Sequence, residues 1–77
     1  MDIKVLGTGC TKCKKLEQMT RDMAAELNLD ANIEKEEDIY KIMQFGVMTT
    51  PALVIDGKVV VKGKVPSIEE ISKLISQ

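Results

Sequence analysis

The segment that decides the fold runs from Ile3 to Cys13 and reads Ile-Lys-Val-Leu-Gly-Thr-Gly-Cys-Thr-Lys-Cys. Its first four residues are rich in branched aliphatic side chains, which is typical of a β-strand. The glycines on either side of Thr8 interrupt this strand, and from Cys10 onward the apolar residues follow helical spacing. The two cysteines therefore lie where a strand passes into a helix.

The helix that begins near Cys10 carries one apolar face. Its members recur at intervals of three and four residues, which places them on the same side of a helix. They are Cys13, Leu16, Thr20, Met23 and Leu27. Asn28 suits the end of this helix, because a short polar side chain tolerates a positive φ.

The middle of the chain predicts a second strand and a second helix. Residues 31–35 form the strand, in which Ile33 is the clearest inward residue. The acidic run at residues 36–38 precedes the helix, since negative charge is favoured at a helix start. Gly46 suits the end of this helix. Its predicted apolar stripe consists of Ile39, Ile42 and Met43.

The last third of the chain predicts a hairpin and a helix. Residues 52–55 are continuously apolar, as expected for a strand that is covered on both faces. Asp56-Gly57 favours a type I′ turn, because both of its central residues need a positive φ, and residues 58–62 return as the partner strand. Ser67 and Glu70 match a capping box. The buried face of this last helix is predicted to contain Ile68, Ile71, Leu74 and Ile75.

The order β-α-β-α-β-β-α defines the expected fold class, α/β. The chain has 77 residues, fewer than a typical domain of ~100–150, so we expect a single domain over residues 1–77. About one helix separates the first two strands, which favours a parallel pair joined by a crossover.

Composition narrows the possible partners. Eleven basic and twelve acidic residues give a net charge of -1, and aromatic residues make up 3%. A nucleic-acid-binding domain normally has a basic excess and stacking aromatics, so we expect no nucleic-acid partner. No stretch approaches the ~18–20 consecutive apolar residues of a membrane helix, and no secretory segment is recognisable. We therefore expect a cytoplasmic protein that does not bind a membrane and, since nothing demands a dimer, a monomer.

The cysteine pair predicts redox chemistry. Unpaired N–H groups and a partial positive charge at a helix start stabilise a thiolate, which is the attacking species in disulfide exchange. Cys10 precedes the first full turn and is the expected nucleophile. Cys13 begins the apolar face and is the expected resolving thiol. Lys12 lies between the two cysteines, and we expect it to lower the pKa of the Cys10 thiol.

Two other interpretations of the pair stay open at this stage. The thiols could be structural, or they could bind a soft metal such as Cu(I), which paired thiolates suit. Small metal-chaperone domains also place C-x-x-C after a first strand, but they run β-α-β-β-α-β and end in a strand. The chain contains no histidine, so a mononuclear zinc site is short of ligands.

With two further motifs the whole chain resembles the thioredoxin superfamily. The motifs are Gly9-Cys10-Thr11-Lys12-Cys13 after the first strand, Thr49-Thr50-Pro51 before an apolar strand, and the strand and turn of residues 52–58. The likeness is to the compact, glutaredoxin-sized form, and most of all to small archaeal and bacterial redox-active disulfide proteins. The chain differs from the usual Trp-Cys-Gly-Pro-Cys of thioredoxins and Cys-Pro-Tyr-Cys of glutaredoxins.

The resemblance implies both a fold and an activity. The fold is a four-stranded mixed sheet flanked by helices. Pro51 is expected to be cis and to face the cysteine pair, and the Thr50 backbone is expected to bind an extended substrate by adding a strand. The implied activity is dithiol–disulfide exchange with client proteins. The implied electron donor is a flavin-dependent disulfide reductase, and no bound cofactor is needed because the cysteines carry the electrons.

Overall fold

The computed structural model describes residues 1–76 and has the predicted order of elements. Gln77, the last residue of the expected domain, lies outside the described residues. The elements are β1 (Asp2–Leu6), α1 (Thr11–Glu26), β2 (Asn32–Glu36), α2 (Ile39–Gln44), β3 (Ala52–Ile55), β4 (Lys58–Lys62) and α3 (Ile68–Ile75).

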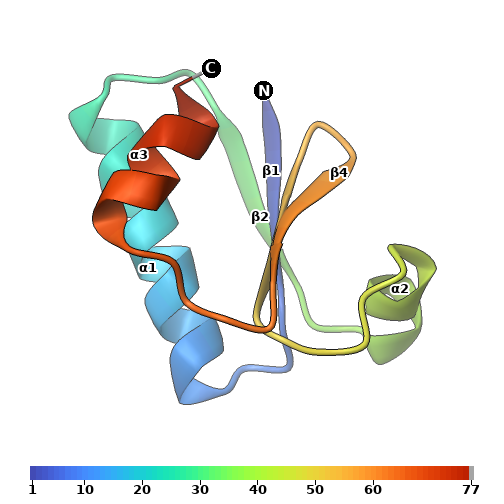
Figure 1. The fold of residues 1–77 in the computed structure, drawn as a ribbon. Helices are drawn as coiled ribbons and strands as arrows, with labels where there is room; N and C mark the ends of the chain where they lie inside the picture. Colours follow the sequence, from blue (N-terminus) through green and yellow to red (C-terminus); the bar gives the residue numbers. More distant parts are fainter. Residues whose placement is uncertain (77) are drawn as a thin grey trace.

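The four strands form one mixed sheet in the order β2-β1-β3-β4. β1 pairs with β2 in parallel, as the helical crossover between them predicts, and with β3 antiparallel. β3 and β4 form the predicted hairpin. Helices α1 and α3 lie on one side of the sheet and α2 lies on the other (Figure 1). The predicted fold class is confirmed.

The two central strands have a core on each face, and the continuous apolar sequence of β3 fits a strand that is covered on both faces. In β1, Val5 packs into the core beneath α1 and α3, whereas the next residue, Leu6, packs into the core beneath α2. In β3, Leu53 belongs to the first core, and Val54 belongs to the second. Successive side chains of a strand point to opposite faces, so each strand serves both cores.

The long helix α1 confirms most of its predicted face. Cys13, Leu16, Thr20 and Met23 are buried. Leu27 was predicted to continue this face, but it is the C-cap residue and is exposed. Ala24 is buried instead, because the helix ends at Glu26 and its last inward position falls one residue after Met23.

The other two helices bury fewer residues than predicted. In the six-residue helix α2 only Ile42 is buried, and the predicted stripe partners Ile39 and Met43 are exposed. In α3, Ile71 and Ile75 are buried and Leu74 packs against the core, but Ile68 is 48% exposed because it stands at the helix start.

The predicted turns and caps are largely confirmed. Asn28 has a φ of 55° after α1, and Asp56 and Gly57 have φ values of 48° and 85° in the hairpin. Ser67 Oγ accepts the N–H of Glu70 at 3.2 Å, as the capping box requires. The acidic run before α2 behaves differently from the prediction. Glu36 ends β2, and Asp38 alone caps the helix by accepting the N–H of Tyr40.

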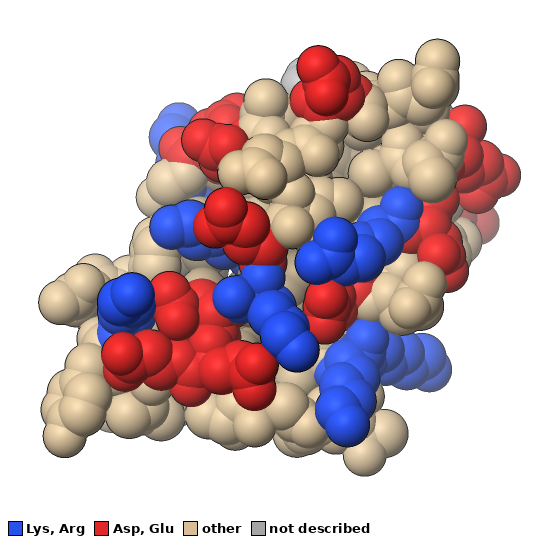
Figure 2. Space-filling model, turned by 180° about the vertical axis from the view of Figure 1, so that it is seen from behind, with Lys and Arg blue, Asp and Glu red and all other residues tan. Residues whose placement is uncertain are grey.

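Basic and acidic side chains lie next to one another across the face shown in Figure 2. Two ion pairs join residues close in sequence: Arg21 pairs with Glu17 at 3.0 Å, and Lys35 pairs with Glu37 at 3.4 Å. Within residues 1–76, no helix has the length and apolar content needed to cross a membrane.

Candidate functional site

Cys10 is the N-cap residue of α1. Its backbone is extended, and its C=O accepts the N–H of Lys14 at 3.0 Å, so the helix begins directly after it. The Sγ atom of Cys10 accepts the N–H of Cys13 at 3.1 Å. The sulfur thus takes the capping position usually filled by a serine or aspartate oxygen, where one of the unpaired N–H groups and the positive end of the helix dipole face it.

Cys13 lies one helical turn further on and is disulfide-bonded to Cys10, with a Cα–Cα distance of 5.0 Å. The two sulfurs differ in access to solvent. Cys10 is exposed, whereas Cys13 is only 5% exposed and faces the sheet. An incoming disulfide can therefore reach Cys10 directly and cannot reach Cys13 before the pair opens.

The missing side chain of Gly7 allows Cys13 to pack closely against the end of β1. A Cβ atom at Gly7 would lie 2.7 Å from Cys13 Cβ and would overlap Cys13 Sγ. Real Cβ atoms essentially never approach another heavy atom this closely, so only glycine fits at this position. The glycine that ends the strand therefore has a packing role beyond interrupting β1.

Thr50 and Pro51 precede β3 at the same end of the sheet as the cysteine pair. The register pairs Leu6, at the end of β1, with Ala52, at the start of β3. The Thr50–Pro51 peptide bond is cis, as the family resemblance implies, and Pro51 is buried. The C=O of Pro51 accepts the N–H of Gly63 at 2.8 Å, which ties this loop to the segment after β4.

Lys12 is exposed in the first turn of α1, between the two cysteines. Lys14 and Lys15 follow it on the same turn and are exposed as well. No acidic residue occupies this first turn. The cysteine end of α1 therefore carries a local excess of positive charge.

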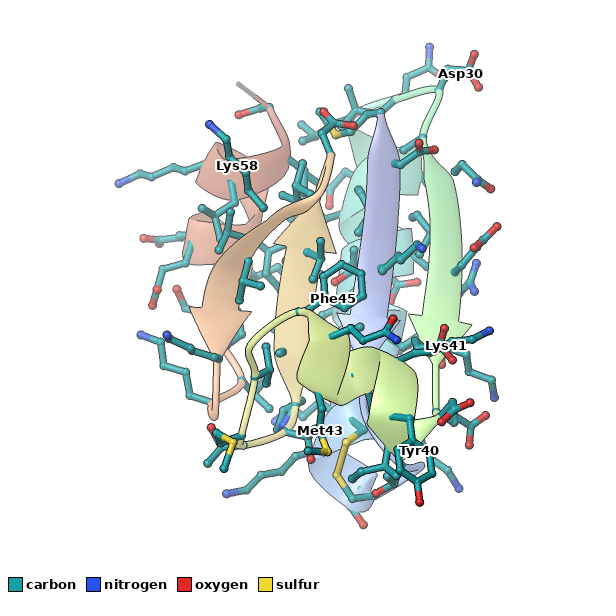
Figure 3. The ribbon with its side chains drawn as sticks, turned by 90° about the vertical axis from the view of Figure 1, so that its right-hand side faces the viewer. Asp30, Tyr40, Lys41, Met43, Phe45 and Lys58 are labelled. Atoms are coloured by element: carbon teal, nitrogen blue, oxygen red, sulfur yellow. A yellow bond between two sulfur atoms is a disulfide. The ribbon has the colours of Figure 1, made fainter. Side chains whose placement is uncertain are left out.

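Large apolar side chains are exposed on α2 and on the loop that leads to Pro51. Tyr40 is 76% exposed, Met43 is 55% exposed and Met48 is 89% exposed. Tyr40 and Met43 project from α2 at the end of the sheet that carries the disulfide (Figure 3). Exposed apolar groups gathered in this way commonly mark a protein-binding surface.

A cavity of about 60 Å³ lies beside Cys13, on the side of the sheet that α1 covers. Its apolar wall comes from β1 and the following loop, and its other wall carries charged side chains. The lining residues are Val5, Gly7, Gly9, Cys13, Lys14, Glu17, Lys35 and Glu37.

An openable disulfide at a helix start, on this mixed sheet and beside a cis-proline loop, defines a protein of the thioredoxin fold with dithiol chemistry. Comparison with known proteins agrees. The model of the thioredoxin domain family matches residues 1–76. The chain belongs to this family.

Two archaeal thioredoxins are similar to the chain over nearly its whole length. The thioredoxin of Methanothermobacter thermautotrophicus is 40% identical over 76 residues, which cover 99% of each chain. The thioredoxin of Methanocaldococcus jannaschii is 38% identical over 71 residues, which cover 92% of this chain and 81% of the relative. Together with the Cys10–Cys13 disulfide, these matches support a thiol–disulfide oxidoreductase.

The metal-chaperone interpretation loses its structural basis. The described elements follow the order β-α-β-α-β-β-α, which differs from the β-α-β-β-α-β order of metal-chaperone domains.

Sequence reasoning did not find the packing of Gly7 against Cys13, nor the position of Glu17 and Glu37 in the wall of the cavity. Glu17 lies four residues after Cys13, and this helical spacing indicates that the two side chains share one face of α1. The position of Glu17 could therefore have been predicted from the sequence. The proximity of Glu37 to Gly9, whose Cβ would lie 3.4 Å from the Glu37 carboxylate, arises from the tertiary fold and has no local sequence signal.

Proposed function

We propose that the protein reduces disulfide bonds in client proteins. In this reaction the Cys10 thiolate attacks a client disulfide and forms a mixed disulfide, which releases the first client thiol. The Cys13 thiolate then attacks Cys10 Sγ, releases the second client thiol and restores the Cys10–Cys13 disulfide. Two electrons pass from the cysteine pair to the client, so no bound cofactor takes part.

The observation that carries this proposal is the contrast between the two sulfurs. Cys10 is exposed, and its Sγ accepts a helix N–H at 3.1 Å, which favours a thiolate there. Cys13 is buried one turn deeper and bonded to it. An accessible thiolate with a sheltered second thiol within reach suits an exchange that must begin at one sulfur and end at the other.

Lys12 has a proposed role in lowering the pKa of the Cys10 thiol. Lys12 lies in the first turn of α1, so its ammonium group adds positive charge at the end of the helix that carries Cys10. The thiol pKa of Cys10 in a Lys12→Glu variant tests this role by the pH dependence of alkylation. We expect the pKa to rise, and an unchanged pKa would remove Lys12 from the mechanism.

Thr50 and Pro51 have a proposed role in binding the client. The cis Thr50–Pro51 bond lies just before β3, at the end of the sheet where β1 leads into the cysteine loop. An extended client segment that pairs with the Thr50 backbone would bring its disulfide to Cys10. The exposed apolar side chains of Tyr40, Met43 and Met48 extend this surface.

The test is trapping of the mixed disulfide with insulin as the probe disulfide protein. Cys13→Ser should accumulate a covalent complex through Cys10, whereas Cys10→Ser should form none. Trapping by Cys10→Ser alone would reverse the two roles. A parent protein that fails to reduce insulin with dithiothreitol as electron source would contradict the proposed function.

The proposed physiological electron donor is a flavin-dependent disulfide reductase of the thioredoxin type, and the proposed working form is a monomeric domain. Steady-state reduction of insulin by such a reductase with NADPH tests the donor. Activity that requires glutathione instead would assign the chain to a different electron source.

A further inference from the structure

The loop that leads into β3 is buried at both ends and more exposed in between. Val47 packs into the core beneath α2, and Pro51 is buried. Met48 and Thr49 are exposed, and Thr50 is half-buried. The Thr50 backbone is the proposed partner of a client strand. A client can pair with it at little cost in ordering only if this middle part of the loop already keeps one position.

Gly63 lies against this loop from the segment that follows β4. β4 ends at Lys62, which pairs with Ala52, the first residue of β3. Gly63 therefore stands opposite Pro51, and its N–H donates to the Pro51 C=O at 2.8 Å. Both segments lie at the end of the sheet where β1 leads into α1 (Figure 1).

The Thr49 side chain fills the space that a side chain at position 63 would need. A Cβ atom added to Gly63 would lie 2.7 Å from Thr49 Oγ1 and 3.4 Å from Thr49 Cβ. Rotation about χ1 would move the hydroxyl away but would leave the Thr49 Cβ in place. The side chain also has few χ1 rotamers, because threonine is branched at Cβ. Thr49 and Gly63 thus pack so closely that a side chain at position 63 would have to displace Thr49.

Gly63 therefore holds Thr50 from both sides. It packs against the residue before Thr50 and is hydrogen-bonded to the residue after it. Gly63 is itself held, because it continues directly from β4, which is paired with β3. We infer that Thr49 and Gly63 are positioning residues that fix the Thr50 backbone for pairing with a client strand. The inference rests on the proposed function and on the role of Thr50 in it.

A second glycine of the chain provides a matched control. Gly63 has a φ of 76°, in the left-handed region that disfavours residues with a side chain, so Gly63→Ala adds backbone strain as well as the contact with Thr49. Gly57 has a φ of 85° in the turn between β3 and β4. Within residues 1–76, a Cβ added to Gly57 would meet no atom within 4 Å beyond its chain neighbours. Gly57→Ala thus adds similar strain without the contact.

The experiment compares a protein substrate with a small one. Insulin, reduced with dithiothreitol as electron source, must present an extended segment beside Cys10, whereas the small aromatic disulfide DTNB needs no strand pairing to reach the sulfur. In Gly63→Ala we expect the KM for insulin to rise about tenfold, which corresponds to the loss of roughly one backbone hydrogen bond to the client. The kcat with insulin and the rate of thiolate release from DTNB should stay close to those of the parent.

Three further variants complete the design. Thr49→Ala removes the packing without straining the backbone, so it should also raise the KM for insulin, and it tests the inference even if Gly63→Ala folds poorly. In the Thr49→Ala background the alanine at position 63 no longer meets a hydroxyl, so its effect on the KM should be smaller than in the parent. Gly57→Ala should keep the parent KM. Circular dichroism at the assay temperature checks that each variant is folded.

The outcomes are distinct. The parent KM for insulin in both Gly63→Ala and Thr49→Ala would overturn the inference, as would fully additive effects of the two changes. Equal effects of Gly63→Ala and Gly57→Ala would assign the change to backbone strain, and a parallel loss with DTNB would assign it to the cysteine pair; either result overturns the inference. In all these cases insulin reduction by the parent leaves the proposed function intact. A parent that reduces neither insulin nor DTNB would instead contradict the proposed function itself.

Discussion

Replacing Gly7 with alanine tests the close packing between the end of β1 and the buried cysteine. The added Cβ would lie 2.7 Å from Cys13 Cβ. Non-bonded carbon atoms rest at about 3.5–4.0 Å, so the two segments must separate by about 1 Å. Neither side yields easily, since Cys13 belongs to α1 and the N–H of Gly7 donates to the C=O of Glu36 at 2.9 Å.

Overpacking of this kind costs about 1–3 kcal/mol of folding free energy. For a domain of this size each kcal/mol lowers the melting temperature by about 4–8 °C. We expect Gly7→Ala to unfold at a correspondingly lower temperature in both redox forms. Thermal unfolding followed by circular dichroism measures the change, and urea unfolding gives the free energy.

A double-mutant cycle isolates the contact. Cys13→Gly removes the Cβ and Sγ that Gly7→Ala would meet, so the alanine should cost less in that background. The cycle is measured on the reduced proteins, because Cys13→Gly cannot form the disulfide. A parent and a Gly7→Ala variant with equal unfolding free energy would refute the packing argument, and equal costs in both backgrounds would place the strain elsewhere.

Three further substitutions test the fold, and a fourth, Ile68→Ala, serves as a control. Ile71→Ala removes a fully buried side chain of α3 and should cost about 2–5 kcal/mol in urea unfolding, whereas Ile68→Ala at the exposed helix start should cost much less. Asp38→Ala removes the cap of α2 and should cost about 0.5–2 kcal/mol by the same measurement. Gly57→Ala forces a side chain into the left-handed region at a φ of 85° and should lower the stability by about 1–2 kcal/mol; an unchanged midpoint would contradict that turn.

The sequence contains most of the fold because its local signals agree with one another. The branched aliphatic strand at Ile3 to Leu6, the Asp56-Gly57 turn and the Ser67 cap are each decided within a few residues, and all are confirmed. The predictions that are wrong concern which side chains are buried. Ile39 and Met43 have helical spacing but are 52% and 55% exposed, and only Ile42 of this short helix is buried.

The cysteine pair is local in sequence, and so it could be predicted, including its place at the helix start. The cavity beside Cys13 could not, because its walls come from segments far apart in the chain. Glu17 reaches it from α1, and Lys35 reaches it from β2. Only the parallel pairing of β1 with β2 brings these side chains to one place.

The central position of β1 in the sheet affects how readily its backbone amides exchange with solvent. β1 is hydrogen-bonded on both sides and leads directly into the cysteine loop, whereas β2 and β4 each have one free edge. Amide protons of Val5 should therefore exchange with deuterated solvent only when the whole domain unfolds, while edge amides exchange through smaller fluctuations. The loop that leads to Cys10 therefore follows the strand that we expect to open last.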